Sequence, residues 1–522
     1  MSLSSSLRSL LARPLNRVVL LAAAVMLLFW AAAFWYGTPY LYSDGDTGTW
    51  IWLLRHGEAV YGSPQQAGLA ARATGALADG LADAGPGLPM RLSNYPPLYM
   101  HAVAWLAPSD AAILRTGAVL SLLGFVAAML GVGVSVARAS GDATGGLVAA
   151  LLLAGSGSAA YNAPSCFPDT AGLGLAVWGV TLAALRRRGW PVLSGLLFCA
   201  AVLVKHSLVV LPAGTCLWAL TQRDTRRAAL LLGASLALPL AATLWALDLF
   251  APLVLWTQAP WTLANFTVQI AVWALPLLPG IGLLFALLRR RGETSTMATQ
   301  VLGPWLVAAL LGVVWLLALG RRGSGANYTI ELITALSVIV PIATAHRIGP
   351  RLAWGHALSA LALTIGLSVY HFGWIWPQQA RDQALVQQVL RDRPGPVVAE
   401  TPWYTTRLGR PPLIISYLAT QLAHAGRWDA TGLLSTLQAG QVAAVILNFP
   451  VGTTPSPGHA DRLPQGVLPL LRDHYQLSAQ TASVFVYTPR PRAVWGATLG
   501  ATPSLHGVSA QPTDTERLAT PR

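Results

Sequence analysis

Apolar segments long enough to cross a bilayer recur along the first 373 residues, and no other feature constrains the fold as strongly. A membrane helix needs about 20 apolar residues. We expect about eleven such helices, at residues 18–36, 114–137, 143–161, 169–186, 189–204, 206–222, 228–248, 268–288, 299–319, 328–346 and 352–373. Charged residues make up only 10% of the chain, against about 25% in soluble domains. The bilayer is therefore the solvent for most of this protein.

The basic residues describe membrane topology. A net charge of +14 could indicate nucleic-acid binding, but the arginines fall in short clusters between apolar runs and not along one face, so we expect no nucleic acid as a partner. Short loops rich in Lys and Arg stay on the cytoplasmic side. With the N-terminus inside, the inner connections carry Arg138, 186–188, Arg223, Arg226, Arg227, 289–291, Arg347 and Arg351.

This topology leaves two regions on the outer side of the membrane. They are a long first loop, residues 37–113, and everything from residue 377 onward. Residues 98–106 are apolar, but counting them as a span would put the arginines at 186–188 outside. We therefore expect a short helix there that lies on or dips into the outer surface. The first apolar run could be a signal peptide or a membrane helix, and the later spans favour a retained anchor.

The expected fold class is a polytopic α-helical membrane protein with a small extracytoplasmic α/β domain at its C-terminus. Residues 1–376 form the membrane domain and residues 377–490 the α/β domain, with strands predicted at 396–400, 442–449 and 483–487 and a helical stretch at 463–475. Residues 491–522 have no apolar period, and we expect them to be disordered. The three cysteines lie in or beside apolar segments and predict neither a disulfide framework nor a zinc site.

Three acidic residues sit at the outer ends of helices. Asp44 and Asp46 follow the first helix, where they could form a solvated Asp-Gly turn or serve as a general base and a second carboxylate. Asp169 opens the predicted helix at 169–186, where a carboxylate caps a helix as readily as it catalyses. All three are expected at the same depth on the same side.

Basic and polar residues are expected at the same rim. Lys205, Arg321 and Arg322 stand on the outer side, against the positive-inside trend, and arginine binds phosphate in a bidentate manner. Snorkelling explains Lys205 equally well. The remaining candidates for substrate binding are Tyr95, which precedes two prolines, and Asn327, Tyr328 and Glu331. Glu331 could instead simply pair with one of the arginines.

These motifs, in this order, resemble the GT-C membrane glycosyltransferases, in particular the branch with the protein O-mannosyltransferases and the aminoarabinose transferase of lipid A. The resemblance is carried by an acidic motif after the first helix (Ser43 to Gly48), a Tyr-Pro-Pro-Leu segment (95–98), Arg115 at the start of the next helix, and the stretch from Arg321 to Glu331. One departure is that glycine separates Asp44 from Asp46, where relatives often have adjacent acids. We take Asp44 as the base.

The resemblance implies an inverting glycosyltransferase that uses a polyprenyl-phosphate sugar as donor. Its acceptor would be a lipid, a glycan or a protein at the extracytoplasmic face of a bacterial plasma membrane. Asp44, Asp46 and Asp169 would be catalytic, and Lys205, Arg321 and Arg322 would bind the lipid phosphate. The same acids could hold a divalent cation, and the residues leave that point open. The alternatives are a transporter or flippase of lipid-linked sugars and a non-catalytic glycan-binding membrane protein.

Overall fold

A computed structural model describes most of the chain. The residues that it describes are 13–36, 42–61, 88–185, 189–222, 224, 226–228, 230–235, 260–290, 296–321, 323–453 and 462–491. For residues 35, 36, 42–44, 158 and 296–299 it describes the backbone alone.

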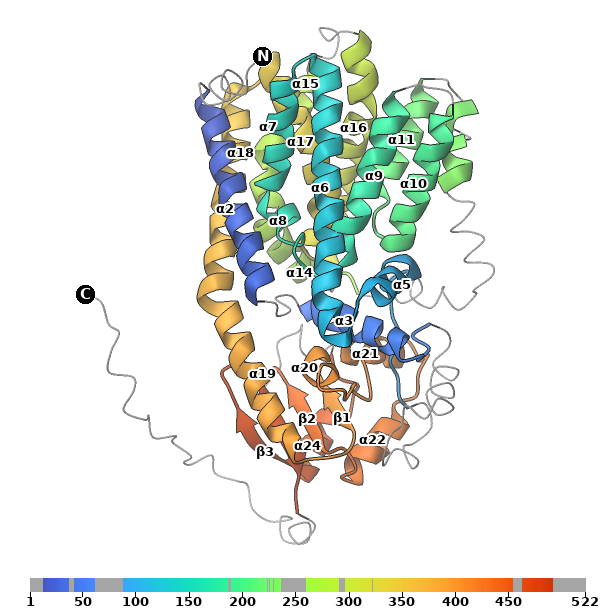
Figure 1. The fold of residues 1–522 in the computed structure, drawn as a ribbon, viewed down its shortest axis with the longest axis vertical. Helices are drawn as coiled ribbons and strands as arrows, with labels where there is room; N and C mark the ends of the chain where they lie inside the picture. Colours follow the sequence, from blue (N-terminus) through green and yellow to red (C-terminus); the bar gives the residue numbers. More distant parts are fainter. Residues whose placement is uncertain are drawn as a thin grey trace, which may run out of the picture.

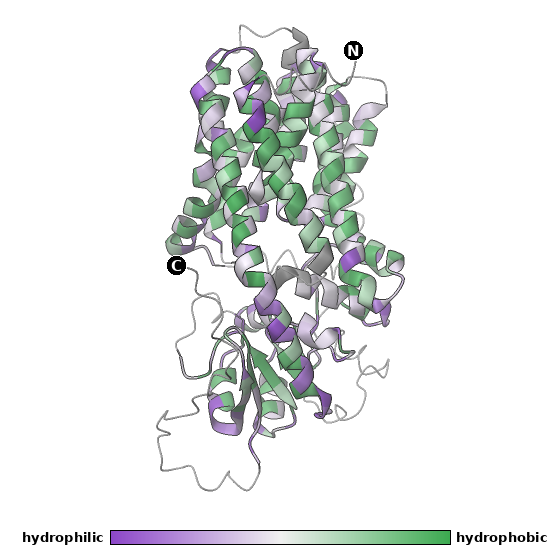
Figure 2. Ribbon diagram, turned by 60° about the vertical axis from the view of Figure 1, so that its left-hand side comes forward, coloured by the Kyte–Doolittle hydropathy of each residue, from purple (hydrophilic) through white to green (hydrophobic). Residues whose placement is uncertain are grey.

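A bundle of apolar helices forms one part of the molecule, and a small sheet with flanking helices forms the other (Figure 1). Hydrophobic residues run along the bundle helices, while hydrophilic ones gather at their ends and over the part that holds the sheet (Figure 2). The bundle contains α2 (Pro14–Tyr36), α6 (Ile113–Ser140), α7 (Ala143–Ala154), α8 (Gly157–Ala160), α9 (Pro168–Ala184), α10 (Trp190–Val204), α11 (Val210–Thr221), α14 (Leu263–Gln269), η3 (Ile270–Ala274), η4 (Leu275–Leu277), α15 (Leu278–Arg289), α16 (Thr296–Trp315), η6 (Leu316–Gly320), η7 (Ala326–Thr329), α17 (Ile330–Ala345) and α18 (Pro350–Tyr370).

Within the described residues, six helices are long and apolar enough to cross a membrane, so the bundle is a membrane-spanning one. The shorter apolar helices are α7, α10 and α11. The predicted helix at 143–161 is interrupted, because α7 ends at Ala154 and the short α8 begins at Gly157. Gly155, between them, packs against α2 so closely that a Cβ there would lie 2.7 Å from that of Ala22. Most of the helix predicted at 228–248 lies outside the described residues. The total of eleven spans stays a prediction.

The last membrane helix is longer than expected. The prediction ended it at residue 373, but α18 continues through the π-helical η8 (His371–Ile375) into α19 (Trp376–Arg391), a helical run of 42 residues. From the sequence, the outer C-terminal region was expected to begin at Pro377. A proline ring clashes with the preceding turn of an α-helix, and here the wider π turn comes directly before it.

The sheet has four strands in the order β1 (Val397–Ala399), β2 (Ala444–Leu447), β4 (Phe485–Pro489) and β3 (Tyr475–Gln480). β1 and β2 pair in parallel, and the other two pairs are antiparallel. The three predicted strands are confirmed. The predicted helix at 463–475 is the shorter α24 (Val467–His474), and β3 was missed because this edge strand exposes most of its side chains.

Apolar side chains cover both faces of this sheet. Val398 and Val445 join a core shared with the first loop, whereas Val397 and Ile446 face Val386 of α19 on the other side. The remaining helices are α20 (Trp403–Thr406), α21 (Ser416–His424) and α22 (Thr431–Gln438). Strands buried on both faces read as continuous apolar runs, which is why the sequence predicted β1 and β2.

The first loop holds two helices that connect the bundle to the sheet. The motif around Asp46 is not a turn but part of α3 (Tyr42–Arg55), and the predicted short helix at 98–106 is α5 (Pro97–Leu106). A buried ion pair joins Arg91 Nη1 to Glu58 Oε2 at 2.7 Å, and Arg91 Nε donates to the Pro412 carbonyl at 2.6 Å. The loop is thereby tied to the C-terminal part of the chain.

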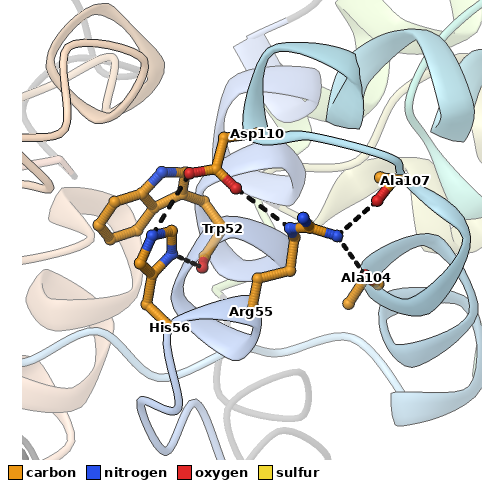
Figure 3. Close-up of polar contacts among 6 residues, drawn as sticks. All are labelled: Trp52, Arg55, His56, Ala104, Ala107 and Asp110. Atoms are coloured by element: carbon orange, nitrogen blue, oxygen red, sulfur yellow. Dashed lines mark hydrogen bonds and ion pairs between the residues drawn. The ribbon is translucent and has the colours of Figure 1, made fainter.

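Arg55, at the end of α3, fixes the end of α5. Its Nη1 donates to the carbonyls of Ala104 and Ala107 at 2.8 and 2.6 Å, and its Nε lies 3.1 Å from Oδ1 of Asp110 (Figure 3). A short 3₁₀ turn, η1 (Asp110–Ala112), follows and leads into α6. Arginine suits this place because the last carbonyls of a helix have no partner within it. These contacts hold α5, and the loop before it, against α3.

Asp382 connects α19 to the sheet and should be essential for that contact. Its buried carboxylate accepts hydrogen bonds from Gln378 Nε2, Thr481 Oγ1 and Ser483 Oγ. Asp382→Ala leaves these donors without a partner, so we expect it to cost about 3 kcal/mol. Hydrogen exchange of the β4 amides should accelerate. The exposed Asp392→Ala serves as the control, and equal exchange in both variants would show that the contact carries no stability.

Candidate active site

A buried ion pair lies where α9 and α10 meet the first loop. Lys205 Nζ is 3.2 Å from Asp169 Oδ2, and the two side chains are 4% and 0% exposed. Pro168 starts α9 and places Asp169 in its first turn, while Lys205 follows the last residue of α10 with an extended backbone. The cost of burying either charge is several kcal/mol, so each needs the other.

Aromatic rings surround the ammonium group. Lys205 Nζ lies 3.9 Å from the centre of the Tyr95 ring and 4.5 Å from that of Phe167. Tyr95 also meets the Trp50 ring edge-on at 5.5 Å. A cation over a ring face is attracted by the ring's quadrupole, more strongly where water is excluded. The rings replace part of the hydration that Lys205 loses.

Asn327 and Glu331 complete the surroundings of the pair. The Asn327 side chain lies near the Asp169 carboxylate, and Glu331 lies within electrostatic range of it. Glu331 accepts hydrogen bonds from the amides of Val210 and Leu211 at 3.2 and 2.8 Å. Both its oxygens are thus engaged at the first turn of α11, an arrangement that favours a positioning role over direct substrate binding. The sequence left open a pairing of Glu331 with an arginine, but in the structure these two amides bind its carboxylate instead.

Asp46 lies in α3, one helical turn before Trp50, and faces the C-terminal part of the chain. It is buried, and its charged neighbours are Arg462 and Glu400. Burial raises the pKa of Asp46 to about 8, with Arg462 lowering it and Glu400 raising it. Arg462 Nη1 lies 3.1 Å from Glu400 Oε1. At neutral pH Asp46 is therefore mostly protonated and can donate a hydrogen bond.

The loop that carries Arg321 is held by the start of α14. Asn265 Nδ2 donates to the carbonyls of Leu319 and Arg321 at 2.9 and 2.7 Å, and the amide of Thr262 donates to Gly320 at 2.8 Å. Arg321 itself is half-buried. The Tyr328 ring stacks on Trp315 at 6.3 Å.

The structure thus brings five of the predicted residues into one cluster: Tyr95, Asp169, Lys205, Asn327 and Glu331. Asp46 lies one helical turn before Trp50, whose ring meets that of Tyr95. The side chain of Asp44 and the whole of Arg322 lie outside the described residues, and Arg115 is exposed on α6. Among the described side chains, no group of three His, Cys, Asp or Glu could hold a metal ion.

The fold has counterparts among solved structures. No family model matches this sequence, and neither does any curated protein. ArnT from Cupriavidus metallidurans bound to undecaprenyl phosphate matches with a TM-score of 0.55 and 13% identity, over 90% of this chain and 97% of that one. The chain shares the fold of this ArnT. The apo state of ArnT (TM-score 0.47, 13% identity, 84% and 95% covered) and the Archaeoglobus fulgidus oligosaccharyltransferase (0.45, 12%, 90% and 73%) are also found.

Some residues of the candidate site were missed by sequence reasoning. Phe167 and Trp50 were not singled out, because single aromatic residues beside apolar segments form no distinctive pattern in the sequence. Glu400 and Arg462 carried no signal, because they are more than 350 residues from Asp46 and lie in a domain that the sequence did not connect to the site.

The buried ion pair predicts strong coupling between its partners. Lys205→Met leaves a lone carboxylate in an apolar setting and should destabilise the protein by about 3–5 kcal/mol. Adding Asp169→Asn should restore most of that loss, because the remaining side chains are neutral. Thermal unfolding of the two single variants and the double variant measures the coupling. Additive losses would mean that the pair does not interact.

The raised pKa of Asp46 predicts that replacing its carboxyl by a neutral amide stabilises the fold, and that the gain in stability depends on pH. In the unfolded chain this carboxyl ionises near pH 4, but in the fold it does so only near pH 8. Below pH 4 the carboxyl is protonated in both the folded and the unfolded state and does not weaken the fold. As the pH rises from 4 to about 8, the unfolded chain releases this proton while the fold keeps it, so the free energy of unfolding falls. Asp46→Asn should therefore match the parent at pH 4 and unfold at a temperature higher by roughly several degrees at pH 8. Asp392→Asn should show no such trend, and a pH-independent Asp46→Asn effect would contradict the assignment.

Proposed function

We propose that this protein transfers a sugar from a polyprenyl-phosphate donor to an acceptor hydroxyl at the outer surface of the membrane. The observation that carries the proposal is the buried pair of Asp169 and Lys205, lined by aromatic rings at the end of the bundle where the acidic helix α3 meets it. The GT-C fold supports it, since ArnT in that fold was crystallised with undecaprenyl phosphate. Charged groups buried at one membrane rim are functional candidates by default.

In the proposed reaction, a carboxylate of α3 takes the proton of the acceptor hydroxyl as its oxygen attacks the anomeric carbon. The bond from that carbon to the phosphate oxygen breaks, and the polyprenyl phosphate departs with the electron pair. Attack opposite the leaving group inverts the anomeric configuration. Proton transfer of this kind contributes about 10²–10⁴-fold to a rate.

We assign the base to Asp44. Asp46 is the poorer candidate, because its pKa of about 8 keeps it protonated at neutral pH. A protonated Asp46 would instead donate a hydrogen bond to the acceptor or to the sugar. Asp169 is engaged with Lys205 and would orient it.

Lys205 would stabilise the departing phosphate together with Arg321 and Arg322. Charge-assisted hydrogen bonds to a developing phosphate charge are strongest where water is excluded, as around Lys205. The hold of Asn265 on the carbonyl of Arg321 supports a loop that keeps one shape. In this proposal Tyr95, Asn327 and Tyr328 line the donor site and Glu331 positions α11. The acceptor is a lipid, glycan or protein, and residues 377–490 form an extracytoplasmic domain beside the site.

The transfer assay that tests this uses purified full-length protein and a polyprenyl-phosphate sugar. Asp44→Asn should lower kcat about 10²–10⁴-fold while donor binding is retained. Lys205→Met would be the wrong probe, because it also destabilises the fold. Asp392→Asn, which is exposed and distant in sequence from the acidic motif, is the matched control.

Three outcomes separate the functions. Loss of turnover with intact donor binding in Asp44→Asn supports the transferase. Transport of the lipid-linked sugar across a vesicle membrane without transfer, unchanged by Asp44→Asn, would establish the flippase instead. Binding of glycan with neither activity would leave a binding protein.

A further inference from the structure

A cavity lies in the bundle at the end opposite the sheet. It has a volume of about 360 Å³ and is lined by α2, α6, α7, α17 and α18. These elements begin or end together at the top of Figure 1, whereas Asp169 lies at the start of α9, toward the sheet. The site proposed for sugar transfer does not include this cavity.

The lining of this cavity changes from polar to apolar with depth. On α2 the order is Arg13, Asn16, Val19, and on α7 Thr144 is followed by Val148 and Leu152. Eight residues of α-helix rise about 12 Å, so the change occupies roughly that depth. The inner residues are closely packed, with Val19 and Leu152 only 3% and 2% exposed. A ligand that fits has a polar head and an apolar tail.

The polar end of the cavity holds one arginine and one acid, and further arginines stand at the helix ends beside it. Arg13 lines it, and its side chain makes no hydrogen bond or ion pair with any other described residue. Further arginines stand at the neighbouring helix ends, namely Arg138, Arg347 and Arg351. The one acid in the lining is Asp142, whose Oδ1 caps α7 by accepting from the Thr144 amide at 2.9 Å. Ser140 and Thr344 donate to carbonyls of their own helices.

We propose that this cavity binds one anionic phospholipid, with its phosphate at Arg13 and one acyl chain between Val19, Val148, Leu152 and Ala357. Basic pockets between membrane helices bind such head groups, and each arginine raises the affinity about fivefold. Buried apolar carbons of the chain add to the binding. The lipid would hold α2 against α7 and α17, at a distance from the chemistry.

Native mass spectrometry of the delipidated full-length protein in detergent tests the proposal. Phosphatidylglycerol should be retained as a single copy and phosphatidylcholine far less, and glycerol phosphate, which has the head group without the chains, should not bind. Ala357→Leu fills the apolar end and should abolish retention, whereas Ala362→Leu, an exposed site on the same helix, should not. Arg13→Gln should weaken binding about fivefold, and Arg17→Gln, one turn further on and not in the lining, should weaken it less.

Several results would overturn the site. They are equal retention of the two phospholipids, binding of glycerol phosphate alone, or full retention by Ala357→Leu. If Ala357→Leu does not fold, the Arg13 and Arg17 variants decide, since both side chains are exposed. None of these variants touches Asp44, Asp46 or Asp169, so an inactive protein that still binds the lipid here would refute only the transferase.

Discussion

The buried contact between Asp169 and Lys205 determines how the other parts of the candidate site are built. The attraction between two opposite charges at 3.2 Å offsets the free-energy cost of removing them from water only if their geometry is fixed and their other polar atoms have neighbours. The Tyr95 and Phe167 rings on one side and Asn327 on the other provide those neighbours. Four separate stretches of chain must therefore meet here before either charge is tolerable.

That meeting depends on contacts further out. Tyr95 belongs to the loop before α5, and Arg55 holds the end of α5 through two carbonyls. The buried pair of Glu58 and Arg91 links the same loop to the carbonyl of Pro412. Asp382 then fastens α19 to the turn between β3 and β4. The C-terminal part is thus a structural support of the first loop as well as a neighbour of Asp46.

The parts predicted well from sequence are those with a long-range apolar signal. Membrane helices and the doubly buried strands β1 and β2 must be apolar throughout, so their sequences admit few other structures. Topology alone also placed Asp169 and Lys205 at one rim, because the positive-inside pattern counts spans and needs no distances. The structure then brings the two into contact with each other, and Lys205 into contact with Tyr95, which lies 110 residues before it in the chain.

The parts not predicted are those decided by neighbours distant in sequence. Nothing within the acidic motif distinguishes a turn from the first turns of α3, because the choice is made by packing: a Cβ on Gly48 would meet Leu114 at 2.6 Å and Trp403 at 3.0 Å. Glycine is required there for close approach, not for flexibility. Likewise the sequence suggested an arginine as the partner of Glu331, but its carboxylate accepts hydrogen bonds from backbone amides in the first turn of α11, which have no partner within the helix.

Asp46 shows what such an arrangement costs. A carboxyl whose pKa rises to about 8 on burial weakens the fold at neutral pH compared with a neutral side chain of the same shape. Glu400 beside it adds to that cost, and Arg462 offsets only part of it. A residue that carried structure alone would gain from replacement by asparagine, so we infer that the acid at this position serves the proposed reaction, in which the protonated Asp46 carboxyl donates a hydrogen bond.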